Sequence, residues 1–328
     1  MTRFSAYRLF EDQGKVQGRI VEMDVDELSA GEVTLRVAYS SINYKDALAA
    51  TGQGKIIRAY PRIGGIDLSG TVAASRDARF REGDEVVVHG FGIGVDTDGG
   101  HAQYARVSGD WILPLPAGLT LLDAATIGVA GYTAALSIHL MELNDLRPES
   151  GKVLVSGATG GVGSIAIDML ALRGYRATAI TGKSDGHDYL KQLGAAEVLP
   201  RNSLEMGARP LEKSLWAGAI DSVGGDFLAW LTRSMQPYGT IACFGNVGGA
   251  ELHTTVIPFI LRGVRLLGIN ANSPMPLRRA VWQRIATDLR PRHLADIAHI
   301  IALDELPAAC AKQLKAETRG RTVIQLRT

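Results

Sequence analysis

The residues with the clearest chemical potential form a glycine-rich turn in the middle of the chain. Gly157, Gly160 and Gly163 follow Lys152–Ser156, whose apolar middle is typical of a strand buried on both faces of a parallel sheet. A strand, a tight turn and a helix N-terminus together present backbone N–H groups and a positive helix end to a phosphate. Because the spacing is G-x-x-G-x-x-G rather than G-x-G-x-x-G, an ordinary glycine-rich turn is the competing interpretation. In this context we predict a dinucleotide site.

The tip of the next predicted strand, Tyr175–Thr181, bears on which nicotinamide cofactor fits. A site for NAD usually carries Asp or Glu about 20 residues after the glycines, to bind the ribose 2′-hydroxyl. The chain offers Thr181–Ser184 instead, with two hydroxyls, Gly182 and the Lys183 ammonium, which suit a 2′-phosphate. Arg201 follows the third strand and adds a second positive charge. The alternative is that Lys183 is an ordinary solvated lysine. NADPH is favoured over NADH.

Bulk properties exclude several classes of protein. The 328 residues are 46% hydrophobic and 21% charged, with a net charge of +1, so nucleic-acid or membrane-surface binding is not expected. Two cysteines, Cys243 and Cys310, form neither a disulfide framework nor a cysteine-rich zinc site, and they suit a reducing cytoplasm. No secretory signal is visible, and the uncharged run Ala124–Met141 is too polar for a membrane span. We predict a cytoplasmic protein.

Apolar periodicity predicts two kinds of domain, and an α/β fold overall. The first third alternates short strands with glycine- and proline-rich turns and is expected to be barrel-like. Its expected elements are strands Val33–Tyr39, Asp67–Ala74 and Glu85–His89, and a helix Asn43–Thr51. After Pro116, strands and helices alternate as in a doubly wound parallel sheet.

The expected elements of the second region begin with a buried helix, Ala124–Leu143. Strands are expected at Lys152–Ser156, Tyr175–Thr181, Glu197–Leu199, Ala217–Val223, Thr240–Phe244 and Val264–Ile269. Helices are expected at Val162–Arg173, His187–Leu193, Asp226–Met235 and Leu277–Leu289. A tail helix near Glu305–Lys315 and a strand Arg321–Leu326 follow no further βα unit, so the tail can return to complete the first domain.

Short motifs spread over nearly the full length of the chain occur in the same order as in a known family. They are Ser41–Leu48, Thr51–Arg58, Gly64–Gly70, Gly83–Val86, Gly157–Gly163, Leu199–Arg201, Pro210–Lys213, Trp216–Asp221, Pro258–Arg262 and Gly320–Thr322. In these the chain resembles the medium-chain dehydrogenase/reductase superfamily and its zinc-free, quinone-oxidoreductase-like branch. Within that branch it looks most like the acryloyl-CoA reductases of the YhdH/AcuI type.

The resemblance implies an architecture and a set of cofactor contacts. A GroES-like domain, 1–122 completed by 296–328, would wrap around a Rossmann domain, 123–295, with the active site between them and a homodimer formed through the edge strand Val264–Ile269. The implied cofactor contacts are Tyr44 near the nicotinamide, Thr159, Gly160, Gly161 and Val162 at the pyrophosphate, Thr181, Gly182, Lys183 and Arg201 at the 2′-phosphate, and Asn246, Phe259 and Asn270 along the cleft.

Zinc ligands are missing at the positions where the resemblance would put them. Zinc-dependent members of the superfamily have Cys in the place of Asn43 and His-Glu in the place of Ile66-Asp67. Catalytic zinc needs three protein ligands and an open position, and the seven histidines are scattered along the chain. We predict no metal.

A zinc-free reductase of this kind suits a C=C bond next to a carbonyl that accepts the charge. NADPH would deliver hydride to the β-carbon of an α,β-unsaturated acyl-CoA, converting acryloyl-CoA to propanoyl-CoA, with protonation at the α-carbon. Asn43 and Tyr44 are expected nearest the reacting atoms, with Asp67 organising the cleft and Arg321 reaching the substrate. The alternatives are a packing role for Tyr44 and a strand cap for Asp67.

Other assignments remain open at this point. Lys55 and Arg58 suit an anionic CoA tail or a solvated loop equally well. An NADPH:quinone or general enone/enal reductase is the competing enzyme, and a redox-silent NADPH-binding protein, like the lens crystallins of this superfamily, is the competing non-enzyme.

Overall fold

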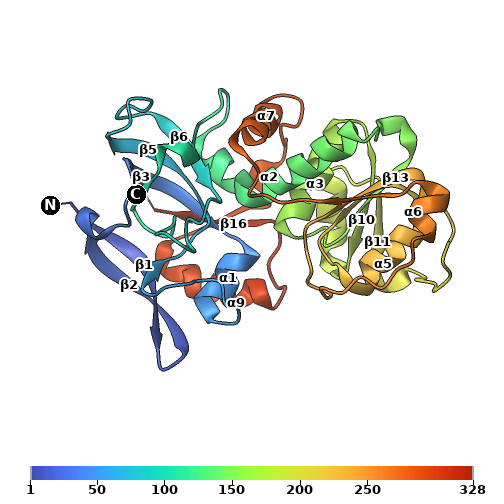
Figure 1. The fold of residues 1–328 in the computed structure, drawn as a ribbon, viewed down its shortest axis with the longest axis horizontal. Coiled ribbons are helices and arrows are strands. Elements are labelled where there is room, and N and C mark those ends of the chain that lie inside the picture. Colours follow the sequence, from blue (N-terminus) through green and yellow to red (C-terminus); the bar gives the residue numbers. More distant parts are fainter. Residues whose placement is uncertain (1, 327–328) are drawn as a thin grey trace. The chain divides into compact units, whose positions relative to one another are not determined.

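The computed structural model describes residues 2–326, which divide into two compact units (Figure 1). Unit 1 holds the chain up to Val129, the segment Pro274–Arg279 and the chain from Leu294 onward; unit 2 holds Ala130–Ser273 and Ala280–His293. The boundaries expected from the sequence, at 122/123 and 295/296, differ from this division and remain a prediction.

Unit 1 is built from two sheets. A three-stranded sheet has the order β2-β1-β4, and a seven-stranded sheet has the order β15-β16-β3-β5-β6-β8, with β7 paired to β3. The strands are β1 (Arg3–Asp12), β2 (Lys15–Asp24), β3 (Val33–Ile42), β4 (Arg62–Ile63), β5 (Asp67–Ser75), β6 (Glu85–His89), β7 (Tyr104–Val107), β8 (Ile112–Pro114), β15 (Ala298–Ile301) and β16 (Arg321–Gln325). The three strands expected here are present, whereas the β1–β2 hairpin was not predicted.

The C-terminal tail supplies part of the seven-stranded sheet. β16 pairs antiparallel with β3, with Thr322 opposite Ile42, and β15 pairs parallel with β16. Between them α9 (Leu306–Leu314) packs on α1 (Tyr44–Thr51). The pairing of β16 places Arg321 next to the start of α1, although hundreds of residues separate them in sequence.

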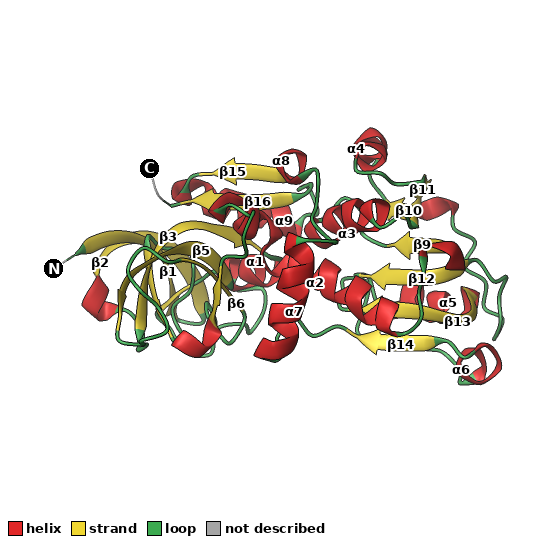
Figure 2. Cartoon of the chain, turned by 90° about the horizontal axis from the view of Figure 1, so that it is seen from above, coloured by secondary structure: helices red, strands yellow, loops and turns green. Residues whose placement is uncertain are grey.

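Unit 2 is a doubly wound parallel sheet. Figure 2 shows its six strands side by side in the order β11-β10-β9-β12-β13-β14, and every pair is parallel. The strands are β9 (Lys152–Val155), β10 (Arg176–Thr181), β11 (Glu197–Pro200), β12 (Trp216–Asp221), β13 (Met235–Cys243) and β14 (Arg265–Gly268). The expected α/β class is confirmed. The strand order reverses at β9, where such sheets bind ligands at their carboxyl ends.

The helices of unit 2 follow the expected alternation. They include α3 (Gly161–Leu172), α4 (His187–Gln192), α5 (Gly225–Ser234) and α6 (Ile257–Arg262). α7 (Met275–Ala286) begins in unit 1 and ends in unit 2, and α8 (Leu294–Ile297) belongs to unit 1. α3 contacts β9 and β10, and α5 contacts β12 and β13. α6 was not predicted. β13 starts five residues before the expected strand because Met235 already pairs with Trp216 across an irregular register.

The long helix α2 (Leu121–Leu143) differs from the continuous helix that was expected. Gly128 has φ 47° and ψ −152°, which breaks the helix, and a Cβ there would lie 2.5 Å from the Asp67 carboxylate. α2 is the helix in the described part of the chain that is long and apolar enough to cross a membrane. Core helices also pass that test of length and composition, and 78% of the apolar window of α2 is buried inside the protein, as in a core helix.

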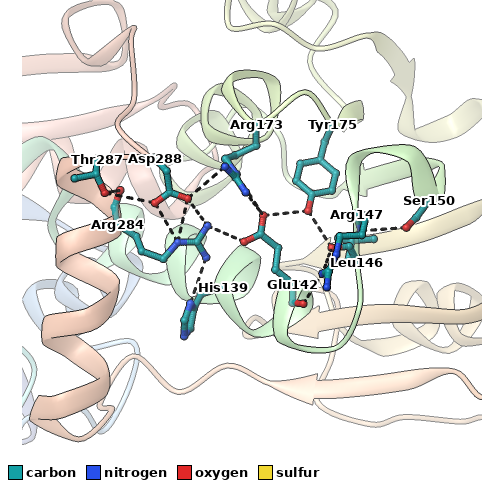
Figure 3. Close-up of polar contacts among 10 residues, drawn as sticks. All are labelled: His139, Glu142, Leu146, Arg147, Ser150, Arg173, Tyr175, Arg284, Thr287 and Asp288. Carbon is teal, nitrogen blue, oxygen red and sulfur yellow. Dashed lines mark hydrogen bonds and ion pairs between the residues drawn. The ribbon is translucent and has the colours of Figure 1, made fainter.

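A polar network ties three helix ends together in unit 2 (Figure 3). Arg284 of α7 lies between two carboxylates, 2.7 Å from Glu142 and 2.6 Å from Asp288. Arg173, at the end of α3, pairs with both carboxylates, and the Tyr175 hydroxyl donates to Glu142 over 3.1 Å. We call this the Arg284 network.

Candidate functional site

The glycine-rich turn has the geometry that a phosphate requires. Gly160 is the N-cap of the twelve-residue helix α3, whose first N–H groups have no intrahelical acceptor and no side-chain cap. Gly163 must be glycine because a Cβ would lie 2.6 Å from the Gly157 carbonyl oxygen. The predicted contacts Thr159 and Gly160–Val162 therefore lie in or beside an anion-binding helix start, which fits a pyrophosphate.

The structure brings the predicted 2′-phosphate residues to one edge of the sheet. β10 and β11 are neighbours with Thr181 opposite Pro200, so Gly182–Lys183 and Arg201 both follow the carboxyl ends of adjacent strands. The Lys183 N–H donates to the Thr181 hydroxyl over 3.0 Å, and Arg201 is exposed. A Cβ on Gly182 would meet no atom within 4 Å, so the space beside it is open.

A pocket of about 540 Å³ lies at the carboxyl ends of β12, β13 and β14. Asn246 and Asn270 line it, together with Gly224 and Gly225 at the start of α5. Phe259 is not one of the lining residues; it packs on the apolar core of unit 2. Sequence reasoning missed Gly224 and Gly225, although a glycine pair directly after an apolar strand was a visible signal.

Three predicted catalytic residues of unit 1 form one buried network. Asp67 is 1% exposed and accepts hydrogen bonds from the Ser41 N–H (3.1 Å) and hydroxyl (2.6 Å), from the Asn43 amide (2.9 Å) and from the Val129 N–H (3.0 Å). The guanidinium of Arg321 lies 3.6 Å from the same carboxylate. We call this the Asp67 network.

Arg321 is held on every side by protein groups. It donates to the Thr126 carbonyl (3.1 Å), the Ile42 carbonyl (3.3 Å), the Asn43 side-chain oxygen (3.1 Å) and the Ser41 hydroxyl. Burial lowers the pKa of Arg321, and the nearby carboxylates oppose that shift. With 3% exposure its guanidinium lies in the interior, so its contacts in unit 1 are structural ones.

Asp46 is a member of this region that sequence reasoning missed. Its carboxylate accepts from the Asn43 N–H (2.9 Å) and amide (3.0 Å) and from the Ile66 N–H (3.1 Å). Burial and then the negative charge of Asp67 raise the pKa of Asp46, while His101 opposes them. The signal was the spacing Asn43-x-x-Asp46, a capping pattern at a helix start.

Tyr44 differs from its neighbours because it is 43% exposed at the first position of α1. Buried Asn43, which precedes it, and buried Asp46, two residues later, fix the backbone from which it projects. Lys55 and Arg58 are also exposed, and Arg58 lies 3.3 Å from Asp96 in an exposed ion pair. Unit 1 therefore combines one exposed phenol with a buried polar support.

No group of three or more His, Cys, Asp or Glu side chains among residues 2–326 is placed to hold a metal ion. The prediction that the protein uses no metal continues to rest on the residues at positions 43, 66 and 67.

Comparisons with known proteins agree with both halves of this description. Residues 29–117 match the family model "Alcohol dehydrogenase GroES-like domain", and residues 161–287 match "Zinc-binding dehydrogenase". The second description names a family, whereas the zinc ligands of that family are absent here at Asn43 and Ile66-Asp67.

Three relatives match almost the whole chain. "Putative quinone oxidoreductase YhfP" of Bacillus subtilis is 47% identical over 328 residues, 99% of each chain, and its crystal structure with NAD bound superposes with a TM-score of 0.97 over 99% of this chain and 100% of that one. "Probable acrylyl-CoA reductase AcuI" of Escherichia coli is 45% identical, over 98% of this chain and 99% of the relative. The yhdH oxidoreductase of Salmonella enterica, in complex with NADP, is 44% identical with a TM-score of 0.96, over 98% and 100%.

Identity at this level over the full length shows the family. The chain belongs to the medium-chain dehydrogenase/reductase superfamily, and within it to the quinone-oxidoreductase-like group that contains YhfP, YhdH and AcuI. The resemblance found in the motifs is thereby confirmed, as is the GroES-like character of the β-rich region.

Proposed function

We propose that this protein is an NADPH-dependent reductase of the C=C bond of an α,β-unsaturated acyl-CoA, converting acryloyl-CoA to propanoyl-CoA. The observation that carries the proposal is the 45% identity, over 98% of the chain, to "Probable acrylyl-CoA reductase AcuI". A second relative of that name, from Ruegeria pomeroyi, is 43% identical over 96% of the chain.

NADPH is the proposed cofactor. The yhdH relative was crystallised in complex with NADP, and the YhfP relative with NAD, so the choice depends on residues of this chain. The tip of β10 has Thr181 and Lys183 where a site for NAD usually has a carboxylate, and Arg201 follows the adjacent strand. These groups support recognition of a 2′-phosphate.

The chain's own residues would perform binding, orientation and charge stabilisation. Bound NADPH supplies the hydride that reaches the β-carbon of the substrate. Hydrogen-bond donors hold the negative charge that develops on the thioester oxygen, an effect of about 3–4 kcal/mol for each well-placed donor. We propose Tyr44 as a group that contacts cofactor or substrate, and Asn43, Asp67 and Arg321 as the positioning residues that fix its backbone.

The competing substrate class is a quinone. The observation in its favour is the 47% identity to "Putative quinone oxidoreductase YhfP". NADPH oxidation followed with acryloyl-CoA, crotonyl-CoA, an enone and a quinone separates the two. We expect the rate of NADPH oxidation to saturate with acryloyl-CoA and to be low with the quinone. The reverse order would contradict the assignment of a thioester substrate.

The cofactor assignment has its own test. Lys183→Ala combined with Arg201→Ala should raise the KM for NADPH roughly tenfold or more and change the KM for NADH little, because only NADPH carries the 2′-phosphate. Lys213→Ala, an exposed lysine outside the proposed site, is the matched control. An equal change in the KM for the two cofactors would show that these side chains do not bind the 2′-phosphate.

We further propose a cytoplasmic homodimer joined through β14. Among residues 2–326 this strand has a partner on one side only, and three apolar side chains of the neighbouring segment are 64–70% exposed: Val256, Ile260 and Leu261. Light scattering should give twice the monomer mass, and Ile260→Glu with Leu261→Glu should lower it to one chain. A monomeric parent protein would exclude the dimer.

A further inference from the structure

A buried carboxylate stands at the carboxyl end of β12, between two turns of unit 2. Asp221 is 0% exposed; its Oδ1 accepts from the Ser156 hydroxyl (2.8 Å) and the Val223 N–H (3.1 Å), and its Oδ2 accepts from the Gly224 N–H (2.9 Å). Burial raises the pKa of Asp221, against the effect of these hydrogen bonds. One carboxylate therefore joins the end of β9 to the turn that starts α5.

The two turns also interlock through Ser222. Its N–H donates to the Ser156 hydroxyl over 2.8 Å, and its own hydroxyl donates to the Ser156 carbonyl over 3.2 Å. Gly157 comes next, with φ +56°, and a Cβ there would lie 2.5 Å from the Ser222 hydroxyl oxygen. A movement of the 222–225 turn would therefore displace the first glycine of the phosphate turn.

The turn on the other side of Asp221 forms a wall of the 540 Å³ pocket. Gly224 and Gly225 both line it. A Cβ on Gly224 would lie 2.7 Å from the Gly249 carbonyl oxygen, so the backbone has little freedom to shift there. The hydrogen bond from the Gly224 N–H to Asp221 thus sets the position of the pocket wall relative to the phosphate turn.

We propose that Asp221 is a positioning residue for the dinucleotide. Its carboxylate holds the Gly157–Gly163 turn and the Gly224–Gly225 wall in fixed relative positions, so that one cofactor can contact both. Asp221 itself is buried, so it acts through the two turns that it joins. The inference rests on the proposed use of a nicotinamide cofactor, and it is independent of which substrate is reduced.

Asp221→Asn tests the geometry directly. The Val223 and Gly224 N–H groups use different carboxylate oxygens, and an amide has only one oxygen. One N–H must then face an NH₂ group, so the turn has to move. Ser156→Ala removes the hydroxyl that donates to Asp221 and accepts from the Ser222 N–H, but it keeps both backbone hydrogen bonds to Asp221, so its effect should be smaller. Asp226→Asn, an exposed residue in the first turn of α5, is the matched control.

The readout is binding, measured without substrate by fluorescence titration or calorimetry. Two ligands are compared: NADPH, and adenosine 2′,5′-bisphosphate, which has the 2′-phosphate but lacks the pyrophosphate and the nicotinamide. For Asp221→Asn we expect the Kd of NADPH to rise about ten- to hundredfold and that of the bisphosphate to change by less than about threefold. Asp226→Asn should leave both values unchanged.

Thermal unfolding of each variant shows whether it is folded at the titration temperature. If Asp221→Asn does not fold, Ser156→Ala carries the test, with the same preferential loss of NADPH affinity expected. Equal weakening of both ligands, or unchanged NADPH affinity in a folded Asp221→Asn protein, would overturn the proposal. A parent protein that binds NADPH but does not reduce acryloyl-CoA would refute the proposed substrate and leave the role of Asp221 standing.

Discussion

The Asp67 network of unit 1 and the Arg284 network of unit 2 use the same residue types in different surroundings. The first pairs Arg321 with the Asp67 carboxylate, and the second pairs Arg284 and Arg173 with the Glu142 and Asp288 carboxylates. The side chains of Arg321 and Asp67 are 4% and 1% exposed, whereas those of Arg284, Glu142 and Asp288 are 19%, 14% and 36% exposed. Water can reach part of the second network and can replace a missing partner there.

The difference in burial indicates the role of each network. In the Asp67 network every donor and acceptor is met by a neighbour, and the product is a fixed backbone under the exposed Tyr44. In the Arg284 network the pairs join the ends of α2, α3 and α7, which is a stabilising role. The first should therefore be far less tolerant of substitution than the second.

The largest expected effect comes from Arg321→Met. Removing the guanidinium leaves the Asp67 carboxylate buried without its cation, so the free energy of unfolding should fall by about 3–5 kcal/mol. Urea denaturation measures it. Adding Asp67→Asn should recover part of the loss, because the uncompensated charge disappears; a double variant less stable than the single would contradict this account.

Gly128→Ala comes next. The residue has φ 47° and ψ −152°, a conformation essentially restricted to glycine, and the new Cβ would press on Asp67, so we expect a loss of about 2–3 kcal/mol. Gly268→Ala, where a Cβ meets nothing within 4 Å, is the control. Equal stability of the two variants would mean that the break in α2 does not serve the Asp67 network.

Arg284→Met should have a smaller effect. We expect a loss of about 1–2 kcal/mol, between the values for exposed and for buried ion pairs, because partial exposure lets water solvate the carboxylates that remain. Arg58→Met removes the pair with Asp96, which is exposed on both sides, and should not measurably change urea denaturation. A loss from Arg284→Met as large as that from Arg321→Met would remove the distinction between the networks.

The smallest effect is the pH dependence of the Arg284 network. Burial alone would raise the pKa of Asp288, but the hydrogen bond and charge of Arg284 and the charge of Arg173 lower it. A carboxyl whose pKa is lower in the folded state stabilises above its unfolded pKa and loses that contribution as the pH falls through the folded value. The advantage of the parent protein over Asp288→Asn in urea denaturation, about 0.5–1 kcal/mol at neutral pH, should therefore shrink as the pH falls below about 4 and vanish once it is below the folded pKa. A constant difference from pH 7 to pH 3 would argue against the ion pair.

Local pattern alone predicted much of the fold and is the basis of the proposed cofactor site. The glycines at 157, 160 and 163, the apolar strand before them and the β10 tip without a carboxylate are all neighbours in sequence, so their spacing carries the information. The strands β3, β5, β6, β9, β10 and β12 were predicted for the same reason: a period of two, or an unbroken apolar run, reflects local backbone geometry.

Apart from the return of the C-terminal tail to the first domain, features that depend on distant contacts were not predicted. The sequence suggested a continuous helix over Ala124–Leu143, but Gly128 breaks it because the Val129 N–H donates to Asp67, far away in the chain. Asn43, Asp67 and Arg321 were singled out, but their burial was not foreseen; it depends on β16 pairing with β3. Asp221 was visible only as part of a family motif.

The sequence by itself thus determined the class of fold, the family and the glycine-rich turn that we propose for a dinucleotide, because short-range spacing and residue type encode them. Tertiary structure decided which polar residues are buried supports and which, like Tyr44, are exposed. That difference is set by long-range strand pairing, which brings residues such as Asp67 and Arg321 together and excludes water from them.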